Sequence, residues 1–124
     1  MAVIKGTRGK DHLTSGTEAD IVKALKGNDV LVANGDDTLS GGTGNDTYRV
    51  FEGGAYVMVD AGGIDTIETD DPDIVLATGI ENLYLYQDDD GILSTAIGND
   101  LPNIITDFGD GPSRIEGGPG RDTL

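Results

Sequence analysis

The sequence predicts an all-β fold in which short parallel strands coil into a solenoid, and three observations support this prediction. The 124 residues include 20 glycines but only 5% aromatic residues, so few large side chains are available for an ordinary globular core. Glycine and aspartate recur with a period of eight or nine residues. Apolar residues recur with the same period, so each coil can stack a narrow file of them on its neighbours.

The clearest copy of the repeat lies at residues 39–48, which read LSGGTGNDTY. Its three glycines allow backbone conformations that a β-carbon would forbid, so the chain can turn tightly around Asp46. The Asp46 carboxylate and the carbonyl oxygens of such a turn are hard oxygen ligands on a flexible loop, which suit calcium. Tyr48 follows in a very short strand, and it is the only large side chain there that we expect to point inward.

The same frame recurs along the chain, with an acidic residue at position six and an apolar residue at position eight. Successive units span residues 6–14, 15–23, 24–32 and 33–40, and the last of these is one residue short. Residues 117–124 repeat the frame almost letter for letter. The apolar position is occupied, at steps of nine, nine, eight and nine residues, by Leu13, Val22, Leu31, Leu39 and Tyr48.

This glycine- and aspartate-rich nonapeptide resembles the hemolysin-type calcium-binding repeat of RTX (repeats-in-toxin) proteins. Short stretches at residues 44–48, 65–67, 80–83 and 98–105 resemble the spacer that often joins two nonapeptide blocks in large secreted RTX proteins. The resemblance implies a right-handed parallel β-roll, or β-helix, with calcium bound in its turns. It also implies leaderless one-step export of an unfolded chain from a bacterium, and a parent protein with a toxin, protease, lipase, adhesin or polysaccharide-modifying domain.

We expect one continuous solenoid domain with three segments. Residues 1–49 form a nonapeptide-repeat β-roll, residues 50–97 form a spacer with longer, irregular coils, and residues 98–124 form resumed but truncated nonapeptide-like coils. With two units per coil, alternate units stack on the same edge of the solenoid. This places the acidic residues in two files, one with Asp11, Asp29 and Asp46 and the other with Asp20 and Asp37.

The spacer is expected to contain longer strands and no bound metal. Its strands are predicted at residues 56–59, 65–69, 73–76 and 81–86, between turns rich in glycine or aspartate. Leu83 and Leu85 alternate with Tyr84 and Tyr86, which indicates one buried and one exposed face. A separate β-sandwich is the alternative fold for this segment. The acidic clusters at residues 70–73 and 88–91 are interpreted as solvated loops, with a weaker calcium site as the alternative.

Each calcium ion is expected between successive turns of one file, where two position-six carboxylates and several turn carbonyls can hold it. The weakest unit is residues 15–23, because Glu18 and Ala24 replace expected glycines and residues 17–27 also read as a capped helix. The predicted metal-binding residues are Gly9, Asp11, Asp20, Gly27, Asp29, Gly35, Asp37, Gly42, Gly44, Asp46, Gly118, Gly120 and Asp122.

Composition excludes several other classes of function. The net charge is −15, from 18 Asp and 5 Glu against 8 Lys and Arg, and this charge opposes nucleic-acid binding. No apolar run approaches the roughly 20 residues that span a bilayer, and no charged-then-apolar leader follows Met1. The chain has no cysteine, so bound calcium would have to replace disulfides in an extracellular domain of this size. The single histidine, His12, is expected to be an exposed strand residue, and no nucleophile arrangement is recognisable by spacing.

The sequence therefore predicts a non-catalytic, calcium-binding module, with two alternatives. The first is an adhesive module in which exposed Tyr84 and Tyr86 contact a polysaccharide or cell-surface glycan. The second is a fragment of a β-helical enzyme that modifies polysaccharides, which would need a long groove with paired basic and acidic residues. An uncapped solenoid end would also favour a cap or end-to-end self-association, because unpaired strand edges bind one another.

Overall fold

The computed structural model describes residues 2–51, 57–60, 62–70, 73–86, 93–109 and 112–124, and these residues form parallel β-strands and no helix. The strands are three to five residues long and are separated by tight turns. They are β1 (Val3–Lys5), β2 (His12–Thr14), β3 (Ile21–Lys23), β4 (Val30–Ala33), β5 (Thr38–Gly42), β6 (Thr47–Val50), β7 (Val57–Asp60), β8 (Thr66–Thr69), β9 (Asp73–Val75), β10 (Asn82–Leu85), β11 (Ser94–Ile97), β12 (Ile104–Asp107) and β13 (Ser113–Glu116).

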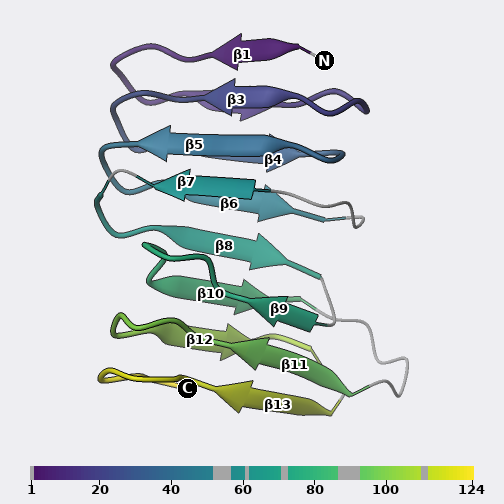
Figure 1. The fold of residues 1–124 in the computed structure, drawn as a ribbon, viewed down its shortest axis with the longest axis vertical. Coiled ribbons are helices and arrows are strands. Elements are labelled where there is room, and N and C mark those ends of the chain that lie inside the picture. The colour runs from purple at the N-terminus through teal and green to yellow at the C-terminus, as the bar shows by residue number, and fades with distance from the viewer. Residues whose placement is uncertain (1, 52–56, 61, 71–72, 87–92, 110–111) are drawn as a thin grey trace.

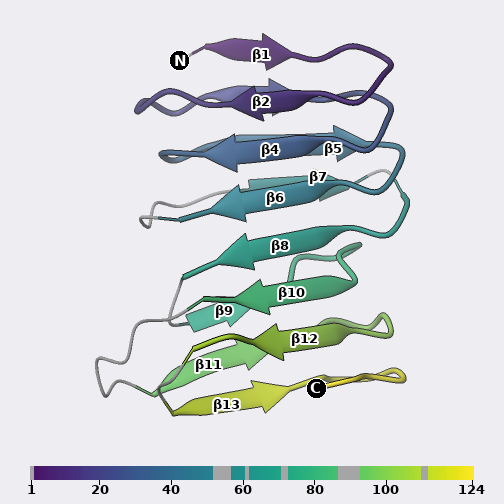
Figure 2. The same ribbon diagram turned by 180° about the vertical axis from the view of Figure 1, so that it is seen from behind.

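The strands stack into a flattened solenoid with the two chain ends at opposite ends of the stack (Figure 1). One face is a six-stranded sheet in the order β2-β4-β6-β8-β10-β12, and it faces the viewer in Figure 2. The other face consists of a four-stranded sheet, β1-β3-β5-β7, followed by a three-stranded sheet, β9-β11-β13. Because successive strands alternate between the two faces, one coil contains two repeat units, as the sequence predicts.

The core is a narrow double file of apolar side chains between the two faces. In β4 and β10, for example, burial alternates along the strand, so Leu31, Leu83 and Leu85 are fully buried. Each buried side chain of this size stabilises the fold by about 1.5–3 kcal/mol. The file on the six-stranded sheet contains Leu13, Leu31, Tyr48, Ile67, Leu83 and Ile105, and the opposite file contains Ile4, Val22, Leu39 and Met58.

Tyr48 is the only aromatic side chain among the fully buried residues of the described chain. Its ring extends the apolar file, and its hydroxyl oxygen accepts a hydrogen bond of 2.9 Å from the backbone N–H of Gly41. The residue thus links the core to the turn that contains Gly41 and Asp46. The inward orientation predicted for Tyr48 is confirmed.

Residues 15–23 coil as the other units do. Residues Ile21–Lys23 form β3, which pairs in parallel with both β1 and β5, so the alternative of a capped helix over residues 17–27 is wrong. Val22 is fully buried between the apolar residues of those two strands. The gain from burying Val22 and pairing both strand edges outweighs the local helix-capping signals.

The β-sandwich alternative for residues 50–97 is also wrong, because β8 pairs in parallel with β6 and β10 and continues the same sheet. The strands do not lengthen in this segment as expected. They remain three or four residues long, while the coil length varies in the connections. Residues that are hydrogen-bonded between adjacent coils are 16 positions apart for Asp65 and Glu81 but 22 apart for Glu81 and Asn103. Residues 88–91 and two residues of the cluster 70–73 lie outside the described residues.

The Tyr48 hydroxyl should contribute to the free energy of unfolding, because it accepts a hydrogen bond from the buried Gly41 N–H. Tyr48→Phe keeps the ring but leaves the buried Gly41 N–H without its acceptor, so the free energy of unfolding should fall by roughly 1–3 kcal/mol. Urea unfolding in calcium-containing buffer measures the change, and Tyr84→Phe on the outer face is the matched control. Equal stability of the two variants would contradict the link between core and turn.

Candidate metal centre

The position-six residues of alternate units form a continuous file, which we call the first edge. Each residue precedes a strand of the six-stranded sheet, or the final bridge between Ile104 and Thr123. In every step but one a carboxylate oxygen accepts the backbone N–H of the residue one coil earlier, for example Asp11 N to Asp29 Oδ1 at 2.7 Å and Asp29 N to Asp46 Oδ1 at 2.9 Å. In the remaining step the Asn103 side-chain amide donates to the Glu81 carbonyl at 3.3 Å. The first edge contains Asp11, Asp29, Asp46, Asp65, Glu81, Asn103 and Asp122.

The carboxylates in the middle of the first edge are buried. Asp29 and Asp46 are 1% exposed, and Asp65 is fully buried. Oδ2 of Asp29 has no hydrogen-bond partner among the described residues. Burial raises the pKa of the Asp29 carboxyl above its usual value of 3.8, and the hydrogen bond from Asp11 N–H opposes this shift only in part. A buried carboxylate oxygen with no donor is a site that a cation satisfies.

A column of glycines brings backbone carbonyl oxygens to the same edge. Gly27, Gly44 and Gly63 have φ angles of 120°, 122° and 120°, in the left-handed region that favours glycine. A β-carbon at Gly27 would lie 2.6 Å from the carbonyl oxygen of Gly9, and one at Gly44 would overlap the carbonyl oxygen of Gly27. Each turn therefore stacks directly on a carbonyl of the preceding turn, and only glycine fits there.

The second edge contains Asp20 and Asp37, on the opposite side of the same coils. The file is continuous here too, since Asp37 Oδ1 accepts Asp20 N–H at 2.9 Å and Asp20 Oδ1 accepts Ala2 N–H at 2.7 Å. The N–H groups of Ala2 and Gly16 hold the pKa of the Asp20 carboxyl below its usual value of 3.8. Gly35 packs against the turn before it, because a β-carbon there would lie 3.1 Å from the carbonyl oxygen of Thr17.

The structure thus divides the predicted site residues into three groups. One turn near the C-terminus, at the last step of the first edge, contains Gly118, Gly120 and Asp122, and Asp122 Oδ1 accepts Asn103 N–H at 2.8 Å. Its neighbour in the file is therefore an amide and not a second carboxylate. The second edge contains Asp20, Gly35 and Asp37. The remaining predicted residues lie on or beside the first edge: Gly9, Asp11, Gly27, Asp29, Gly42, Gly44 and Asp46.

Asp65 is not among the predicted metal-binding residues, because residues 65–67 are assigned to a spacer without metal. The signal was present, because Gly63, Asp65 and Ile67 occupy positions four, six and eight of the frame. Asp46 N–H donates to Asp65 Oδ1 at 2.7 Å, so Asp65 continues the first edge. The 19-residue step from Asp46 to Asp65 exceeds two nine-residue units, and this broke the expected register.

Oxygen is the dominant ligand type in both edges. No group of three or more His, Cys, Asp or Glu side chains converges among the described residues, so a metal here would combine one or two carboxylates with backbone carbonyls. Such mixed oxygen sets on turns suit calcium, which takes six to eight oxygen ligands in flexible geometry. Transition metals favour imidazole or thiolate ligands instead.

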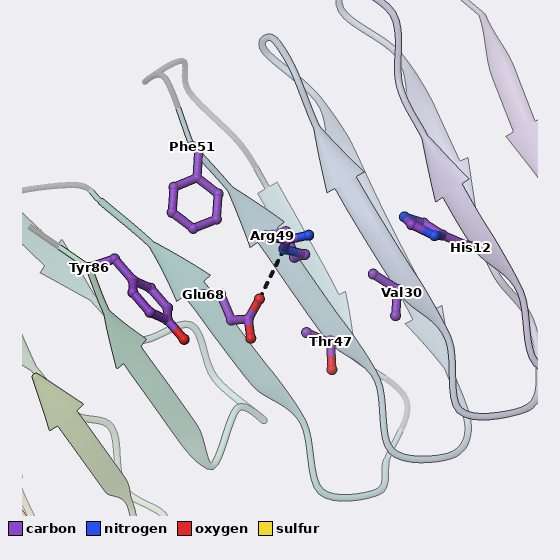
Figure 3. A pocket seen from close by; sticks show the side chains of 7 residues that line it. All are labelled: His12, Val30, Thr47, Arg49, Phe51, Glu68 and Tyr86. Atoms are coloured by element: carbon purple, nitrogen blue, oxygen red, sulfur yellow. Dashed lines mark ion pairs between the residues drawn. The ribbon is translucent and has the colours of Figure 1, made fainter. Parts of the chain in front are cut away.

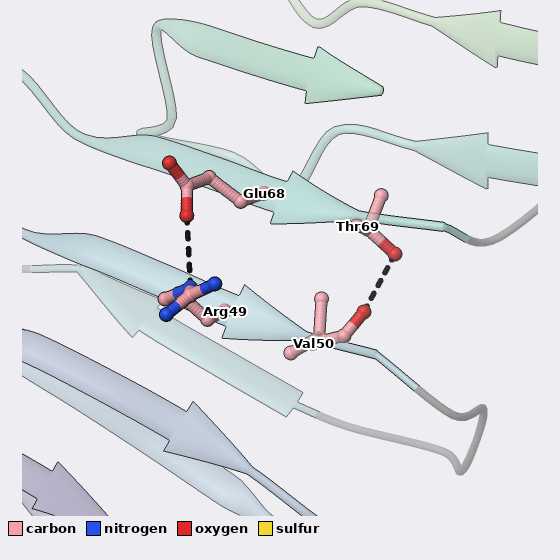
Figure 4. Close-up of polar contacts among 4 residues, drawn as sticks. All are labelled: Arg49, Val50, Glu68 and Thr69. Carbon is pink, nitrogen blue, oxygen red and sulfur yellow. Dashed lines mark hydrogen bonds and ion pairs between the residues drawn. The ribbon is translucent and has the colours of Figure 1, made fainter. Parts of the chain in front are cut away.

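The outer face of the six-stranded sheet has a shallow groove of about 670 Å³ that runs from β2 across β4, β6 and β8 to the end of β10. Arg49 Nε and Glu68 Oε2 form an ion pair of 3.0 Å in its floor, beside Phe51 and Tyr86 (Figure 3). One residue further along the same strands, Thr69 Oγ1 donates to the carbonyl of Val50 at 2.7 Å (Figure 4). These links join β6 of the last nonapeptide to β8 of the spacer. His12, at one end of the groove, is exposed on β2 as predicted.

Comparison with known protein families agrees with this geometry. The model of the RTX calcium-binding nonapeptide repeat matches four copies, at residues 3–31, 15–48 and 109–124, which together cover half of the chain. The chain belongs to this RTX family. Proteins with RTX repeats bind calcium, and their fold is the parallel β-roll, so the recognition and the fold class drawn from the sequence are confirmed.

The RTX match does not extend to residues 49–108, so Asp65 and Glu81 lie outside it. No curated protein and no solved structure matches the chain. Within the described residues, no helix has the length and apolar character needed to cross a membrane.

Asp29 and Asp20 should have opposite effects on the stability of the calcium-free coil as the pH changes. The pKa of Asp29 is raised, so its contribution is fully present below pH 3.8 and is lost as the pH rises through the raised value. The pKa of Asp20 is lowered, so its contribution is present above pH 3.8 and is lost as the pH falls through the lowered value.

Thermal unfolding in a chelator measures these effects, with trimethylamine N-oxide added to keep the coil folded. Between about pH 3 and pH 7, Asp29→Asn should reduce the loss of stability at rising pH, because a neutral amide does not ionise. Asp20→Asn is the matched control and should reduce only the loss at falling pH. The same pH dependence in both variants would contradict the environments assigned to the two carboxylates.

Proposed function

We propose that this chain is a calcium-gated folding module, which coils into a β-roll when it meets calcium outside a bacterial cell. The observation that supports the proposal best is the buried Oδ2 of Asp29, which has no hydrogen-bond partner among the described residues although Oδ1 of the same carboxylate accepts the Asp11 N–H. The predicted metal-binding residues of the first edge supply the ligands, namely position-six carboxylates and carbonyl oxygens of the glycine turns.

The fold itself explains why calcium would decide between coil and disorder. Stacking the first edge brings negative charges together, and two unit charges 4 Å apart repel by roughly 4 kcal/mol at an effective dielectric constant of 20. The core is a narrow double file of apolar residues, and its burial must offset both this repulsion and the entropy lost on folding. Binding to the folded state alone adds about 2.7 kcal/mol per site when calcium is at a hundred times its dissociation constant.

Export in the unfolded form follows from the same physics. RTX repeats occur in secreted bacterial proteins, and a chain that folds only with calcium stays extended in the low-calcium cytosol. The chain has no cysteine, so no disulfide is available to hold the coils outside the cell. We propose a leaderless one-step route and a non-catalytic role, with any enzymatic or toxic activity in another part of the parent protein.

End-to-end self-association is also part of the proposal. Among the described residues, β1 pairs only with β3 and β13 pairs only with β11, so each has one edge with unpaired backbone groups. Parallel strands of a second copy could pair with these edges in the register already used within the solenoid.

Calcium should convert the chain from disorder to β-structure. Circular dichroism during a calcium titration should show the transition, whereas magnesium at the same concentrations should not, because Mg²⁺ demands compact octahedral geometry and sheds its water reluctantly. A β-sheet spectrum that persists unchanged in excess chelator would overturn the proposal.

Glycan binding is a second candidate function, and the aromatic cluster on the outer face favours it. The rings of Tyr86 and Phe108 stack with centroids 4.9 Å apart, and Phe51 and Tyr84 contact the same pair at 6.1 and 5.7 Å. Tyr86 is 39% exposed and Phe108 is 55% exposed, so apolar ring faces remain open to solvent. Cross-strand aromatic pairs also stabilise sheets without binding anything, which is the alternative role of this cluster.

The ion pair beside these rings suits a carbohydrate. Arg49 can donate hydrogen bonds to sugar hydroxyls and Glu68 can accept them, while the ring faces pack on the apolar faces of the sugar. The Arg49 guanidinium also lies 5.6 Å from the centre of the Phe51 ring, so the polar and aromatic parts of the groove are contiguous. The net charge of −15 favours a neutral polysaccharide over an anionic one.

A glycan array with the calcium-loaded protein tests this second function. Tyr86→Ala, and Tyr84→Ala beside it, should weaken binding of any glycan by tenfold or more, since about 1.4 kcal/mol of lost contact is a tenfold change in affinity. Val75→Ala is the matched control, because Val75 is an exposed apolar residue on the other face. If the wild-type protein binds no glycan, glycan binding is ruled out and the aromatic cluster only stabilises the sheet.

A further inference from the structure

We propose that calcium is needed on one edge of the solenoid only. The Asp29, Asp46 and Asp65 turns of the first edge bind it, and the second edge, with Asp20 and Asp37, closes by hydrogen bonds without metal. This inference rests on the proposed calcium-binding function and narrows the sequence-based prediction that both files bind calcium. It also adds Asp65, which lies outside the segments matched by the RTX repeat model.

The first reason is the backbone at position two of each turn. On the first edge, Leu25 and Gly42 occupy this position with φ angles of 85° and 91°, in the left-handed region. Leu25 is the only residue other than glycine with such an angle among the described residues, so its neighbours must hold it there. The Leu25 carbonyl accepts Thr43 N–H at 3.0 Å, which ties this conformation to the next coil.

The turn that contains Leu25 also contains an open carboxylate. Oδ2 of Asp29, four residues after Leu25, is buried and receives no hydrogen bond, although its Oδ1 accepts Asp11 N–H. The carbonyls of Gly9 and Gly27 stack along the same edge through the glycine column. A divalent cation can take this oxygen together with the neighbouring carbonyls.

The second edge is already closed by its own donors. Asp37 Oδ2 accepts the Ser15 hydroxyl at 2.6 Å and the Asn34 N–H at 3.2 Å, and the Asn34 side-chain amide donates to the Ser15 carbonyl at 2.9 Å. Asp20 Oδ2 accepts Gly16 N–H at 2.8 Å. Both outer oxygens thus have the donors that Asp29 Oδ2 lacks.

The turns of the second edge also lack the glycine column. Neither Gly16 nor Gly35 has a positive φ angle, and position four of the first of these units is Glu18. Gly35 packs on the Thr17 carbonyl but without a left-handed backbone, and the Ser15, Asn34 and Asp37 network supplies further contacts between these turns. The unit at residues 33–40 is one residue shorter than the others, which is consistent with a turn that encloses no metal.

Asp65 extends the metal-binding edge beyond the nonapeptide block. It is fully buried, and its Oδ1 accepts Asp46 N–H at 2.7 Å, in the same way that Asp46 accepts Asp29 N–H. Gly63 has a φ angle of 120° and stacks on the Gly44 carbonyl, so the glycine column continues to this turn. The Asn45 side chain accepts Ile64 N–H at 2.9 Å and repeats the contact between Asn28 and Asn45.

The experiment compares Asp65→Asn with Asp37→Asn in the full chain. The two carboxylates are matched, since both are at most 2% exposed and both accept one N–H from the coil before. Isothermal titration with calcium chloride gives the affinity, and equilibrium dialysis at saturating calcium gives the number of bound ions. Asp65→Asn should lose an ion or weaken calcium binding by tenfold or more, whereas Asp37→Asn should keep the wild-type number and affinity.

The possible outcomes separate this inference from the proposed function. If the wild-type chain binds no calcium, the proposed function fails. If it binds calcium but Asp37→Asn loses an ion, or Asp65→Asn loses none, only the one-edge inference fails. Should Asp37→Asn not fold, Asp20→Asn replaces it, because this variant removes the other carboxylate of the second edge. An unchanged ion number in Asp20→Asn supports the inference, and a reduced number overturns it.

Discussion

The fold depends on stacking carboxylates at the spacing of the coils. On the first edge Asp29, Asp46 and Asp65 each use one oxygen to accept a backbone N–H from the coil before, so they act as a ladder of charge-assisted hydrogen bonds. The same stacking concentrates negative charge in a buried position, which is unfavourable unless a cation or further donors are present. The stacking of carboxylates therefore links folding to the binding of a cation.

The sheets and the turns hold this file in place together. A slip of one residue in the six-stranded sheet would move Leu31 and Tyr48 from the core to the outer face, so the apolar file specifies the register. That register places Asp29 and Asp46, each directly before a strand, one above the other. The glycine column then sets the separation of the turns, because the carbonyl of Gly27 occupies the space that a β-carbon at Gly44 would need.

The turns and the outer face of the six-stranded sheet differ in the residues they contain. The turns bring charge together and depend on glycine and aspartate, whereas the outer face of the six-stranded sheet gathers Phe51, Tyr84, Tyr86 and Phe108 around an ion pair. Residues on this face are not needed to fill the core, so they can vary with function. A rigid solenoid that forms only with calcium would present such a surface only where calcium is abundant.

Much of this structure could be predicted from the sequence, because a nine-residue rhythm specifies a coil without reference to distant residues. The period placed Leu13, Leu31 and Tyr48 in one apolar file and separated the aspartates into two edges, and both predictions are confirmed. Where the repeat period changes, only the tertiary structure shows which conformation the chain adopts. Residues 17–27 carry helix-capping signals, but Ile21–Lys23 form a strand that pairs with β1. Asp65 lies on the first edge because the coil between Asp46 and Asp65 is longer. The left-handed backbone of Leu25 and the closure of Asp37 by Ser15 depend on contacts between coils, and local sequence does not encode such contacts.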